Sequence, residues 1–249
     1  MIELHQGDCI KVIDKLVQNN VKVDSIITDI PYGTTKCVWD IVIPFDEMWD
    51  AINSIKKDER TPILLFGQEP FSSFLRCSNL EQYKYDIYWQ KERLTNVMQV
   101  KKRPGKVIEN ISVFYEKQCY YNPIMSKHEG KPVKNKIKDG SLGELIDGGN
   151  KKPVEYIDTG ERYPLQIVRF VRDMHNKIHP TQKPVALMEY LVETYSEPFD
   201  IVLDFTMGSG TTGVACKKLN RYFIGIEKET EVFMNAYERI EEYDRTEKH

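Results

Sequence analysis

Hydrophobic positions along the first half of the chain follow two alternating patterns. Short runs of β-branched and other apolar residues are typical of buried strands, whereas apolar residues three or four positions apart are typical of amphipathic helices. The runs predict strands at Ile2–His5, Val23–Thr28, Thr61–Phe66, Tyr85–Trp89 and Ile111–Tyr115. The spaced positions predict helices at Cys9–Val17 and Pro44–Ile55.

The pattern fades between Asn122 and about Lys177 and then returns. In that stretch Pro, Gly, Lys and Asp accumulate, as in an inserted recognition region or a disordered loop. Beyond it the pattern predicts helices at Pro184–Tyr195, Thr211–Leu219 and Thr230–Tyr243 and strands at Ile201–Asp204 and Tyr222–Ile226. Strands that alternate with helices predict an α/β fold with a mostly parallel, doubly wound sheet.

The composition is that of one soluble globular domain. With 249 residues, 41% of them hydrophobic, and a mean hydropathy of −0.50, the chain can form one sizeable core and an inserted element. No run approaches the roughly 18 apolar residues of a membrane helix, and the first ten residues lack the pattern of a secretion signal. The five cysteines never stand in CxxC spacing, which argues against disulfides and a zinc site and favours the cytoplasm.

Basic residues concentrate in the middle of a chain whose formal net charge is −3. Between Lys91 and Lys138, twelve Lys and Arg stand against four acids, a balance of +8, so the remainder carries −11. An acidic body with a basic middle is typical of a surface that binds a polyanion. A solvated loop region would explain the same charges equally well.

A glycine-rich turn follows the predicted strand that ends at Asp204. The sequence DFTMGSGTTG leads into a helix, and its three glycines match GxGxxG, a spacing that lets the backbone approach a nucleotide closely. Glu227, at the end of the next predicted strand, can bind the two hydroxyls of a ribose. The motif therefore predicts a cofactor that contains a nucleoside, either NAD or S-adenosylmethionine.

Two features of this turn favour the methyl donor. Asp204 stands directly before the glycines, where a carboxylate attracts a cationic amino-acid group and repels a pyrophosphate. The motif also lies near the C-terminus, whereas a NAD-binding domain usually begins with it.

A second turn, Asp29-Ile30-Pro31-Tyr32-Gly33, follows the predicted strand Val23–Thr28. The exocyclic amine of a nucleobase is a poor nucleophile, because its lone pair is delocalised into the ring. Two acceptors on its N–H groups, the Asp29 carboxylate and the Ile30 carbonyl, would free that lone pair for attack on a methyl group. Pro31 stiffens the turn, and Tyr32 offers a flat face for a flipped base. A structural turn with a packed tyrosine is the simpler interpretation for this motif alone. Together with the glycine motif, a catalytic role is the better interpretation.

Together the two turns resemble the hallmark motifs of the DNA amino-methyltransferases, which methylate adenine N6 or cytosine N4. The family's D/N/S-P-P-Y motif corresponds to Asp29–Tyr32, and its D-x-F-x-G-x-G-like motif to the turn that begins at Asp204. Further similar segments are Gly7-Asp8-Cys9, the D-I-x-W-x-K-like strand Tyr85–Lys91, and His179–Pro184, which resembles an H-P-T-x-K-P motif. The resemblance spans nearly the whole chain except about 120–177. The catalytic motif comes first, an order that resembles the permuted β group found in restriction–modification systems and phages.

Two positions depart from the family's pattern. Ile30 replaces the first proline of the catalytic motif, but the required atom is a backbone carbonyl, so we expect the chemistry to survive. The cofactor motif begins Asp204-Phe205-Thr206 and not with the commoner D-P-F. An Asp at the start of the catalytic motif is more typical of adenine enzymes and a Ser of cytosine-N4 enzymes, which makes adenine N6 the expected target.

The resemblance implies a Rossmann-like methyltransferase fold, circularly permuted, with a seven-stranded, mostly parallel sheet and helices on both faces. It implies S-adenosylmethionine as cofactor, double-stranded DNA as partner, no metal, and a place in the cytoplasm of a bacterium or a phage-infected cell. A homodimer and a cognate restriction endonuclease are further partners that the family suggests. The expected organisation is a catalytic half at 1–119, a target-recognition region at 120–177 and a cofactor-binding half at 178–249.

The residues carried over to this chain fall into three groups. The catalytic group is Asp29, Ile30, Pro31 and Tyr32. The expected cofactor contacts are Asp8, Cys9, Asp29, His179, Thr181, Lys183, Asp204, Phe205, Thr206, Gly208, Ser209, Gly210, Thr211, Thr212 and Glu227. The expected DNA contacts are Lys91, Arg93, Lys101, Lys102, Arg103 and Lys106. Phe205 and Trp89 could line the base pocket, but core packing is the simpler interpretation for both.

Three other functions stay open. A NAD-dependent oxidoreductase would share the glycine motif but leaves the other motifs unexplained. A DNA-binding protein without activity would have no need of Asp29 and Tyr32. An RNA or protein amino-methyltransferase more often places the cofactor motif first in the chain.

Overall fold

The computed structural model describes residues 1–34, 40–127, 134–136, 155–157, 160–172 and 182–246. The chain forms two compact units, one made of Met1–Asn122 with Gln166–His249 and the other of Pro123–Leu165. Within the described part of the chain, each helix is too short or too polar to cross a membrane.

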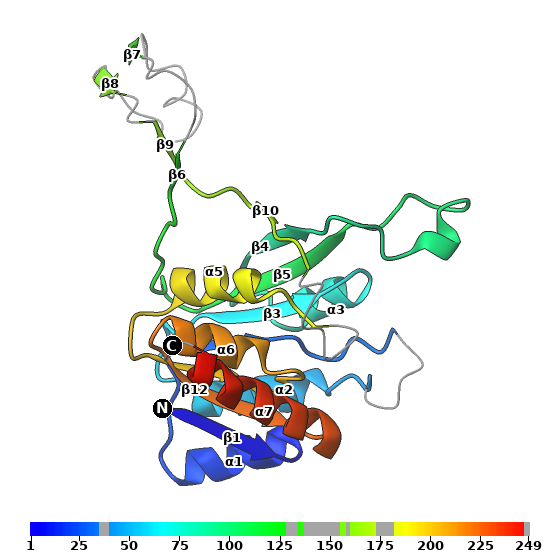
Figure 1. Cartoon of the computed structure of the whole chain (residues 1–249), viewed down its shortest axis with the longest axis vertical. Helices are drawn as coiled ribbons and strands as arrows, with labels where there is room; N and C mark the ends of the chain where they lie inside the picture. Colours follow the sequence, from blue (N-terminus) through cyan, green and yellow to red (C-terminus); the bar gives the residue numbers. More distant parts are fainter. Residues whose placement is uncertain (35–39, 128–133, 137–154, 158–159, 173–181, 247–249) are drawn as a thin grey trace. The chain divides into compact units, whose positions relative to one another are not determined.

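A large sheet forms the centre of the first unit (Figure 1). Its strands are β1 (Ile2–Gln6), β2 (Ser25–Thr28), β3 (Ile63–Gly67), β4 (Tyr83–Gln90), β5 (Ile108–Phe114), β10 (Ile167–Arg169), β11 (Ile201–Asp204) and β12 (Tyr222–Glu227). They lie in the order β1-β12-β11-β2-β3-β5-β4-β10, and β5 alone runs antiparallel to its neighbours.

The predicted α/β class and the mostly parallel sheet are confirmed, but the sheet has eight strands and not seven. The additional strand, β10, lies in the stretch expected to form the insertion and pairs in parallel with β4, where Val168 is opposite Trp89. Only Val168 of its three residues is buried. A strand this short carries no hydrophobic pattern of its own, so its existence depends on the neighbour that supplies its hydrogen bonds.

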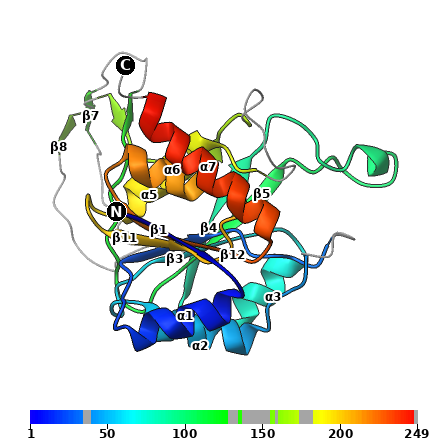
Figure 2. The same ribbon diagram turned by 60° about the horizontal axis from the view of Figure 1, so that its bottom comes forward.

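Helices cover both faces of the sheet (Figures 1 and 2). They are α1 (Cys9–Gln18), α2 (Phe45–Ile55), α3 (Phe71–Ser78), α5 (Val185–Tyr195), α6 (Thr211–Lys218) and α7 (Thr230–Thr246), with a short 3₁₀ helix, η1 (Val97–Gln99), between β4 and β5. Figure 2 shows α1, α2 and α3 on one face and α5, α6 and α7 on the other. The helix α3 has no predicted counterpart, although Phe71, Phe74 and Leu75 stand at helical spacing and Phe71 and Leu75 are buried.

Two hydrophobic cores follow from this arrangement. Successive side chains of a strand point to opposite faces, and in β2 Ile27 packs with the α5–α7 core while Ile26 packs with the α1–α3 core. All four residues of β2 and all five of β3 are buried. Burial on both faces explains why these strands are continuous apolar runs in the sequence and do not alternate between apolar and polar residues.

The second unit contains two short antiparallel pairs. Strand β6 (Ser126–Lys127) pairs with β9 (Glu161–Arg162), and β7 (Lys134–Lys136) pairs with β8 (Glu155–Ile157). Its bounds lie within the predicted recognition region at 120–177, whose function stays a prediction.

Strand direction determines where ligands can bind. Strands β1, β12, β11 and β2 are consecutive neighbours and parallel, so their carboxyl ends meet at one edge of the sheet. In open α/β sheets this edge is where ligands are bound.

We expect the central strand β2 to dominate stability. Ile27 is fully buried, whereas Ile41 is 68% exposed. Ile27→Ala should lower the free energy of unfolding by about 2–5 kcal/mol, because it leaves a cavity in a packed core. The matched change Ile41→Ala should stay within about 0.5 kcal/mol of the parent. Urea denaturation monitored by circular dichroism measures both, and equal losses would contradict this description of the core.

Candidate active site

Four turns meet at the carboxyl edge of the sheet. Gly7 follows β1, Glu227 ends β12, the glycine-rich turn follows β11, and the Asp29 turn follows β2. The Gly7 amide donates to the Glu227 carbonyl across 2.9 Å, which joins the first two. The predicted cofactor and catalytic motifs, far apart in the sequence, are therefore brought to one place.

Hydroxyl groups connect the Asp29 turn to the glycine-rich turn. The Thr206 hydroxyl donates to the backbone carbonyl of Asp29 across 3.1 Å. The hydroxyl oxygen of Thr28, the last residue of β2, lies 2.7 Å from that of Thr206. These contacts fix the position of Asp29 relative to the turn that follows Asp204.

The Asp204 carboxylate is turned into the protein. It accepts hydrogen bonds from the hydroxyls of Thr28 and Thr212, at 2.7 and 2.5 Å, and from the Thr206 amide at 3.3 Å. Burial raises its pKa to about 6, because these donors only partly replace lost solvation. The sequence assigned this carboxylate to a cationic group of the cofactor, whereas here it organises the turns.

The first glycine of the turn faces open space. Gly208 has φ +51°, in the left-handed region that favours glycine, and no atom lies within 4 Å of where a Cβ would stand. Its amide donates to the Glu227 carboxylate across 3.1 Å. A backbone with free space beside an acid at the end of the next strand fits the ribose of a nucleoside cofactor.

The second and third glycines of the motif face α7 instead. A Cβ at Gly210 would stand 2.8 Å from Cδ1 of Ile240, and one at Gly213 would stand 2.6 Å from the same atom. Gly210 also has φ +71° at the start of α6. These two glycines therefore allow close helix packing, a role that the sequence motif alone does not distinguish from contact with a cofactor.

The turn is also held from the side of α7. The guanidinium of Arg239 donates to the Ser209 carbonyl at 3.0 Å and to the Thr211 hydroxyl at 2.9 Å. The side chains of Ser209, Thr211 and Thr212 are buried. Arg239 had no predicted role, because a single arginine on an amphipathic helix gives no signal in a sequence.

The turn that begins at Asp29 is held on several sides. The Asp40 carboxylate accepts the amides of Tyr32 and Gly33, both at 2.8 Å, and Ile30 is buried in the α1–α3 core. The Tyr32 ring packs against Phe71, with ring centroids 5.3 Å apart. Asp40 was also not predicted, because an isolated aspartate between helix and strand signals is not distinctive.

A largely buried ion cluster includes Asp29, whose own side chain is 29% exposed. Its carboxylate accepts hydrogen bonds from the Tyr32 hydroxyl and the Lys183 ammonium. Lys183 lies 2.9 Å from Glu109, which accepts a second bond from Tyr32 at 3.2 Å and pairs with Lys91. The sequence assigned Lys183 to the cofactor and Lys91 to DNA, but the structure places both in this cluster.

Burial and charge shift the pKa values of the cluster. Burial alone would raise the pKa of Glu109, but the Lys183 and Lys91 ammonium groups outweigh it and hold the pKa at about 2. Burial, Asp29 and Glu109 together raise the pKa of Tyr32 well above its usual value. Tyr32 is therefore a hydrogen-bond donor at neutral pH.

Glu109 is the main site residue that the sequence did not predict. It lies on β5 within IENISVF, where most neighbours are buried. A charged residue inside an apolar strand is rarely buried unless it is paired, and this signal could have singled it out.

The other predicted cofactor contacts lie in different environments. Asp8 caps α1 by accepting the Lys11 amide, and burial, with the Asp8 charge, raises the pKa of Cys9 to about 11. Phe205 is 1% exposed and packs in the core, as does Trp89. His179 and Thr181 lie outside the described residues.

The predicted DNA contacts lie mainly on the connection between β4 and β5, which extends from the sheet in Figure 1. Arg93, Lys101, Lys102 and Arg103 are exposed. Lys106 is half-buried and donates to Gln68 across 2.5 Å, and burial, with the Lys91 charge, lowers its pKa. Four of the six predicted DNA contacts are thus accessible to a phosphate backbone.

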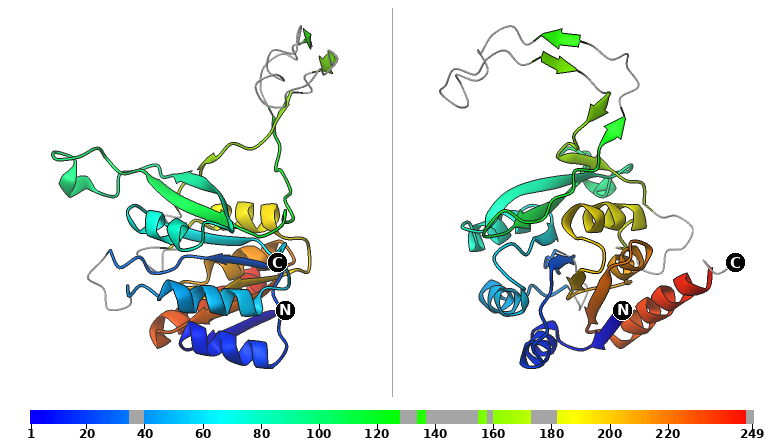
Figure 3. Two further views of the ribbon diagram at one scale, coloured as in Figure 1. Left: turned by 180° about the vertical axis from the view of Figure 1, so that it is seen from behind. Right: turned by 90° about the vertical axis from the view of Figure 1, so that its left-hand side faces the viewer.

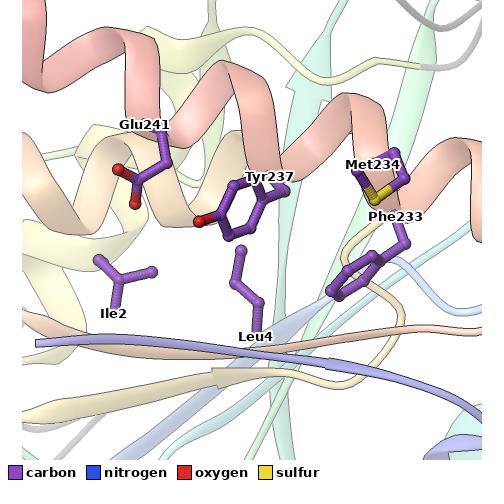
Figure 4. Close-up of a pocket in the computed structure, with 6 residues that line it drawn as sticks. All are labelled: Ile2, Leu4, Phe233, Met234, Tyr237 and Glu241. Atoms are coloured by element: carbon purple, nitrogen blue, oxygen red, sulfur yellow. The ribbon is translucent and has the colours of Figure 1, made fainter.

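A pocket of about 240 Å³ lies elsewhere, between β1 and α7 (Figure 4). Ile2 and Leu4 form its floor, and Phe233, Met234, Tyr237 and Glu241 of α7 line the other side. Figure 3 shows α7 and α1 on opposite sides of β1. None of these lining residues belongs to the turns described above.

The strand order and the two motif turns define a Rossmann-like methyltransferase. A family model described as DNA methylase matches residues 23–238. The chain therefore belongs to the DNA methylase family of N6-adenine and N4-cytosine methyltransferases.

Individual relatives agree with this assignment. The chain is 28% identical to the DNA adenine methyltransferase YhdJ of Escherichia coli (strain K12), over 94% of this chain and 81% of that protein. It is 27% identical to the type II methyltransferase M1.MboII of Moraxella bovis, over 94% of each chain. The crystal structure of an M1.HpyAVI–SAM complex superposes with a TM-score of 0.64 at 31% identity, over 96% of this chain and all of that one.

The burial of Asp204 predicts a pH effect on stability. Because its pKa rises from an ordinary 3.8 to about 6 on folding, the native state binds this proton more tightly than the unfolded state. Stability from this group should be greatest below pH 4 and should fall by up to about 3 kcal/mol as pH rises through 6. Asp204→Asn lacks this titration, so its stability relative to the parent should improve between pH 4.5 and 7. Urea denaturation across that range gives the difference, and parallel curves would contradict the assignment.

Proposed function

We propose that this protein transfers a methyl group from S-adenosylmethionine to N6 of adenine in double-stranded DNA. The Asp29 carboxylate and the Ile30 carbonyl accept the two N–H groups of a flipped base. The observation that carries the proposal is the order of the strand ends at the carboxyl edge of the sheet.

That order matches the order of chemical groups in the reacting complex. Asp8 follows β1, Glu227 ends β12, Gly208 follows β11 and Asp29 follows β2, and these strands are consecutive neighbours. In the proposed assignment the four positions contact the cofactor's adenine, its ribose, its methionine part and the target amine, respectively. A cofactor lying across these ends would bring its methyl group next to Asp29.

The cofactor supplies an electrophilic methyl group on a cationic sulfur. The protein's own contribution is to localise the lone pair of the target amine and to hold it in line. The carbonyl of Asp29 is fixed by Thr206 and the amide of Tyr32 by Asp40, so the backbone on either side of the Ile30 carbonyl is held in place. Preorganised acceptors of this kind account for much of the rate in many enzymes.

The exposed basic residues of the β4–β5 connection would bind the DNA backbone. Phosphate contacts position a duplex without reading its sequence, and the second unit, Pro123–Leu165, is the proposed source of sequence recognition. The cytoplasm, where bacterial or phage DNA is accessible, is the proposed location. A homodimer and a cognate restriction endonuclease are the further partners that we propose.

Methyl transfer and the identity of the base can be tested together. Purified protein should transfer tritium from labelled S-adenosylmethionine to duplex DNA, with no absorbance change when NAD is offered with the same preparations. Modification-sensitive sequencing of DNA from cells that express the protein should report N6-methyladenine within a defined sequence. Detection of N4-methylcytosine at that site would show that cytosine, and not adenine, is the target base.

Asp29 should be essential for chemistry but not for cofactor binding. Asp29→Ala removes an acceptor of the amine and should lower the methylation rate at least about 100-fold. Equilibrium dialysis with labelled cofactor should still detect binding, because the proposed ribose contact at Glu227 is unchanged. A turnover near that of the parent would exclude the catalytic role.

DNA affinity should depend steeply on salt through the β4–β5 connection. Replacing Lys101, Lys102 and Arg103 by Ala should flatten the slope of log affinity against log salt by about 2–3, close to one unit per lost phosphate contact. The matched control Lys11→Ala/Lys15→Ala changes exposed residues of α1 and should leave the slope unchanged. Fluorescence anisotropy at several salt concentrations measures the slope, and equal slopes for parent and triple variant would exclude this surface.

A further inference from the structure

The acceptor that the proposed reaction needs is already occupied by the protein. One oxygen of the Asp29 carboxylate accepts the Tyr32 hydroxyl, and the other accepts the Lys183 ammonium. An incoming amine must therefore share this carboxylate with its present donors or displace one of them. Lys183 is the stronger competitor, because its full charge weakens Asp29 as an acceptor for a neutral amine.

Lys183 cannot simply leave. Its side chain is 10% exposed and lies over the Phe66 ring, with the ammonium 4.9 Å from the ring centroid. A buried ammonium that loses its counter-ion is strongly destabilised. Displacement from Asp29 therefore requires a second acceptor within reach.

Glu109 provides that acceptor. Its carboxylate lies 2.9 Å from the Lys183 ammonium, and its side chain is 8% exposed. It comes from β5, outside both motif turns, and Lys91 pairs with its other oxygen. Lys91 in turn lies over the Trp89 ring, 4.8 Å from the centroid, which helps to hold Glu109 in place.

The charges in this cluster balance and persist. Two carboxylates, Asp29 and Glu109, face two ammonium groups, Lys91 and Lys183. Burial alone would lower the pKa of Lys183, but Asp29 and Glu109 outweigh it and raise that pKa. At neutral pH Lys183 is therefore an ammonium ion, and it contacts both carboxylates.

We propose that Lys183 is a latch on Asp29 in the free protein, and that Glu109 is a positioning residue that takes over its ammonium when the target base arrives. The inference rests on the proposed function, in which Asp29 accepts the amine. Glu109 itself does not contact the reacting atoms in this scheme. It acts by making Asp29 available at a small energetic cost.

A double-variant experiment separates this scheme from a structural role. Glu109→Gln keeps the shape of the side chain but removes the charge that retains Lys183, so Lys183 should stay on Asp29. The single-turnover methylation rate should fall about tenfold or more, with little change in the affinity for S-adenosylmethionine. Adding Lys183→Met removes the competitor, so the double variant should recover most of the lost rate.

If Glu109 merely supports the fold or contacts the base, the rate losses caused by Glu109→Gln and by Lys183→Met should add. A double variant that methylates no faster than Glu109→Gln overturns the latch. The matched control is Glu116→Gln, which also loses an ion pair with a lysine, Lys56, but lies outside the cluster. It should methylate at the parent rate. Thermal melting of each variant confirms that it is folded.

A second measurement does not depend on Glu109→Gln being stable. With 2-aminopurine placed beside the target base, fluorescence reports how much of the base is flipped out of the duplex. Lys183→Met should increase the flipped fraction relative to the parent, because the Asp29 oxygen that accepted the ammonium is then available to the base. An unchanged or smaller fraction overturns the proposal.

The activity of Asp29→Ala distinguishes a failure of the proposed catalytic role from a failure of the latch. If Asp29→Ala retains activity, the proposed catalytic role fails and the latch fails with it. If Asp29→Ala is inactive but the Glu109→Gln/Lys183→Met pair shows no recovery, only the latch fails.

Discussion

The parallel pairing of β11 with β2 is the constraint on which the site depends. It places the last residues of these strands side by side, so that Thr28, Asp204 and Thr206 can form one hydrogen-bonded group. That group fixes the Asp29 carbonyl relative to the glycine-rich turn. It requires burial of the Asp204 carboxylate, which is energetically unfavourable. The arrangement shows how a site can trade stability for the fixed geometry of two turns.

The ion cluster around Asp29 follows a different principle. Buried charges are stable only when they are paired, and here each carboxylate has an ammonium partner and each ammonium an aromatic neighbour. A balanced set of charges can exchange partners without exposing any of them to an apolar environment. In the proposed reaction, this combination of order and exchange would make Asp29 available to a neutral base.

Much of this architecture could be predicted from the sequence. The same physical reasons explain which elements and site residues could not be predicted. Strands such as β2 and helices such as α2 were predicted because burial imposes a period on their residues, and both motif turns were recognised because their backbones need glycine, proline or a terminal acid. The strand β10 was missed because its three residues show no period, whereas α3 was overlooked although Phe71, Phe74 and Leu75 stand at helical spacing. Glu109, Asp40 and Arg239 were missed because their roles arise from tertiary contacts. The contacts that Lys91 and Lys183 make in the ion cluster, and the packing of Gly210 against α7, were not foreseen, because a motif gives residue identity but not the tertiary neighbours of a residue.

The position of β1 has a consequence for how the protein is made. Strand β1 is an edge strand whose single neighbour in the main sheet, β12, lies near the other end of the chain. As the polypeptide leaves the ribosome, β1 and one side of β2 must wait for partners that are translated last. Contacts so distant in the chain form slowly, and unpaired apolar strands tend to aggregate. The permuted order of motifs thus means that the sheet can be completed only after β11 and β12 have been synthesised.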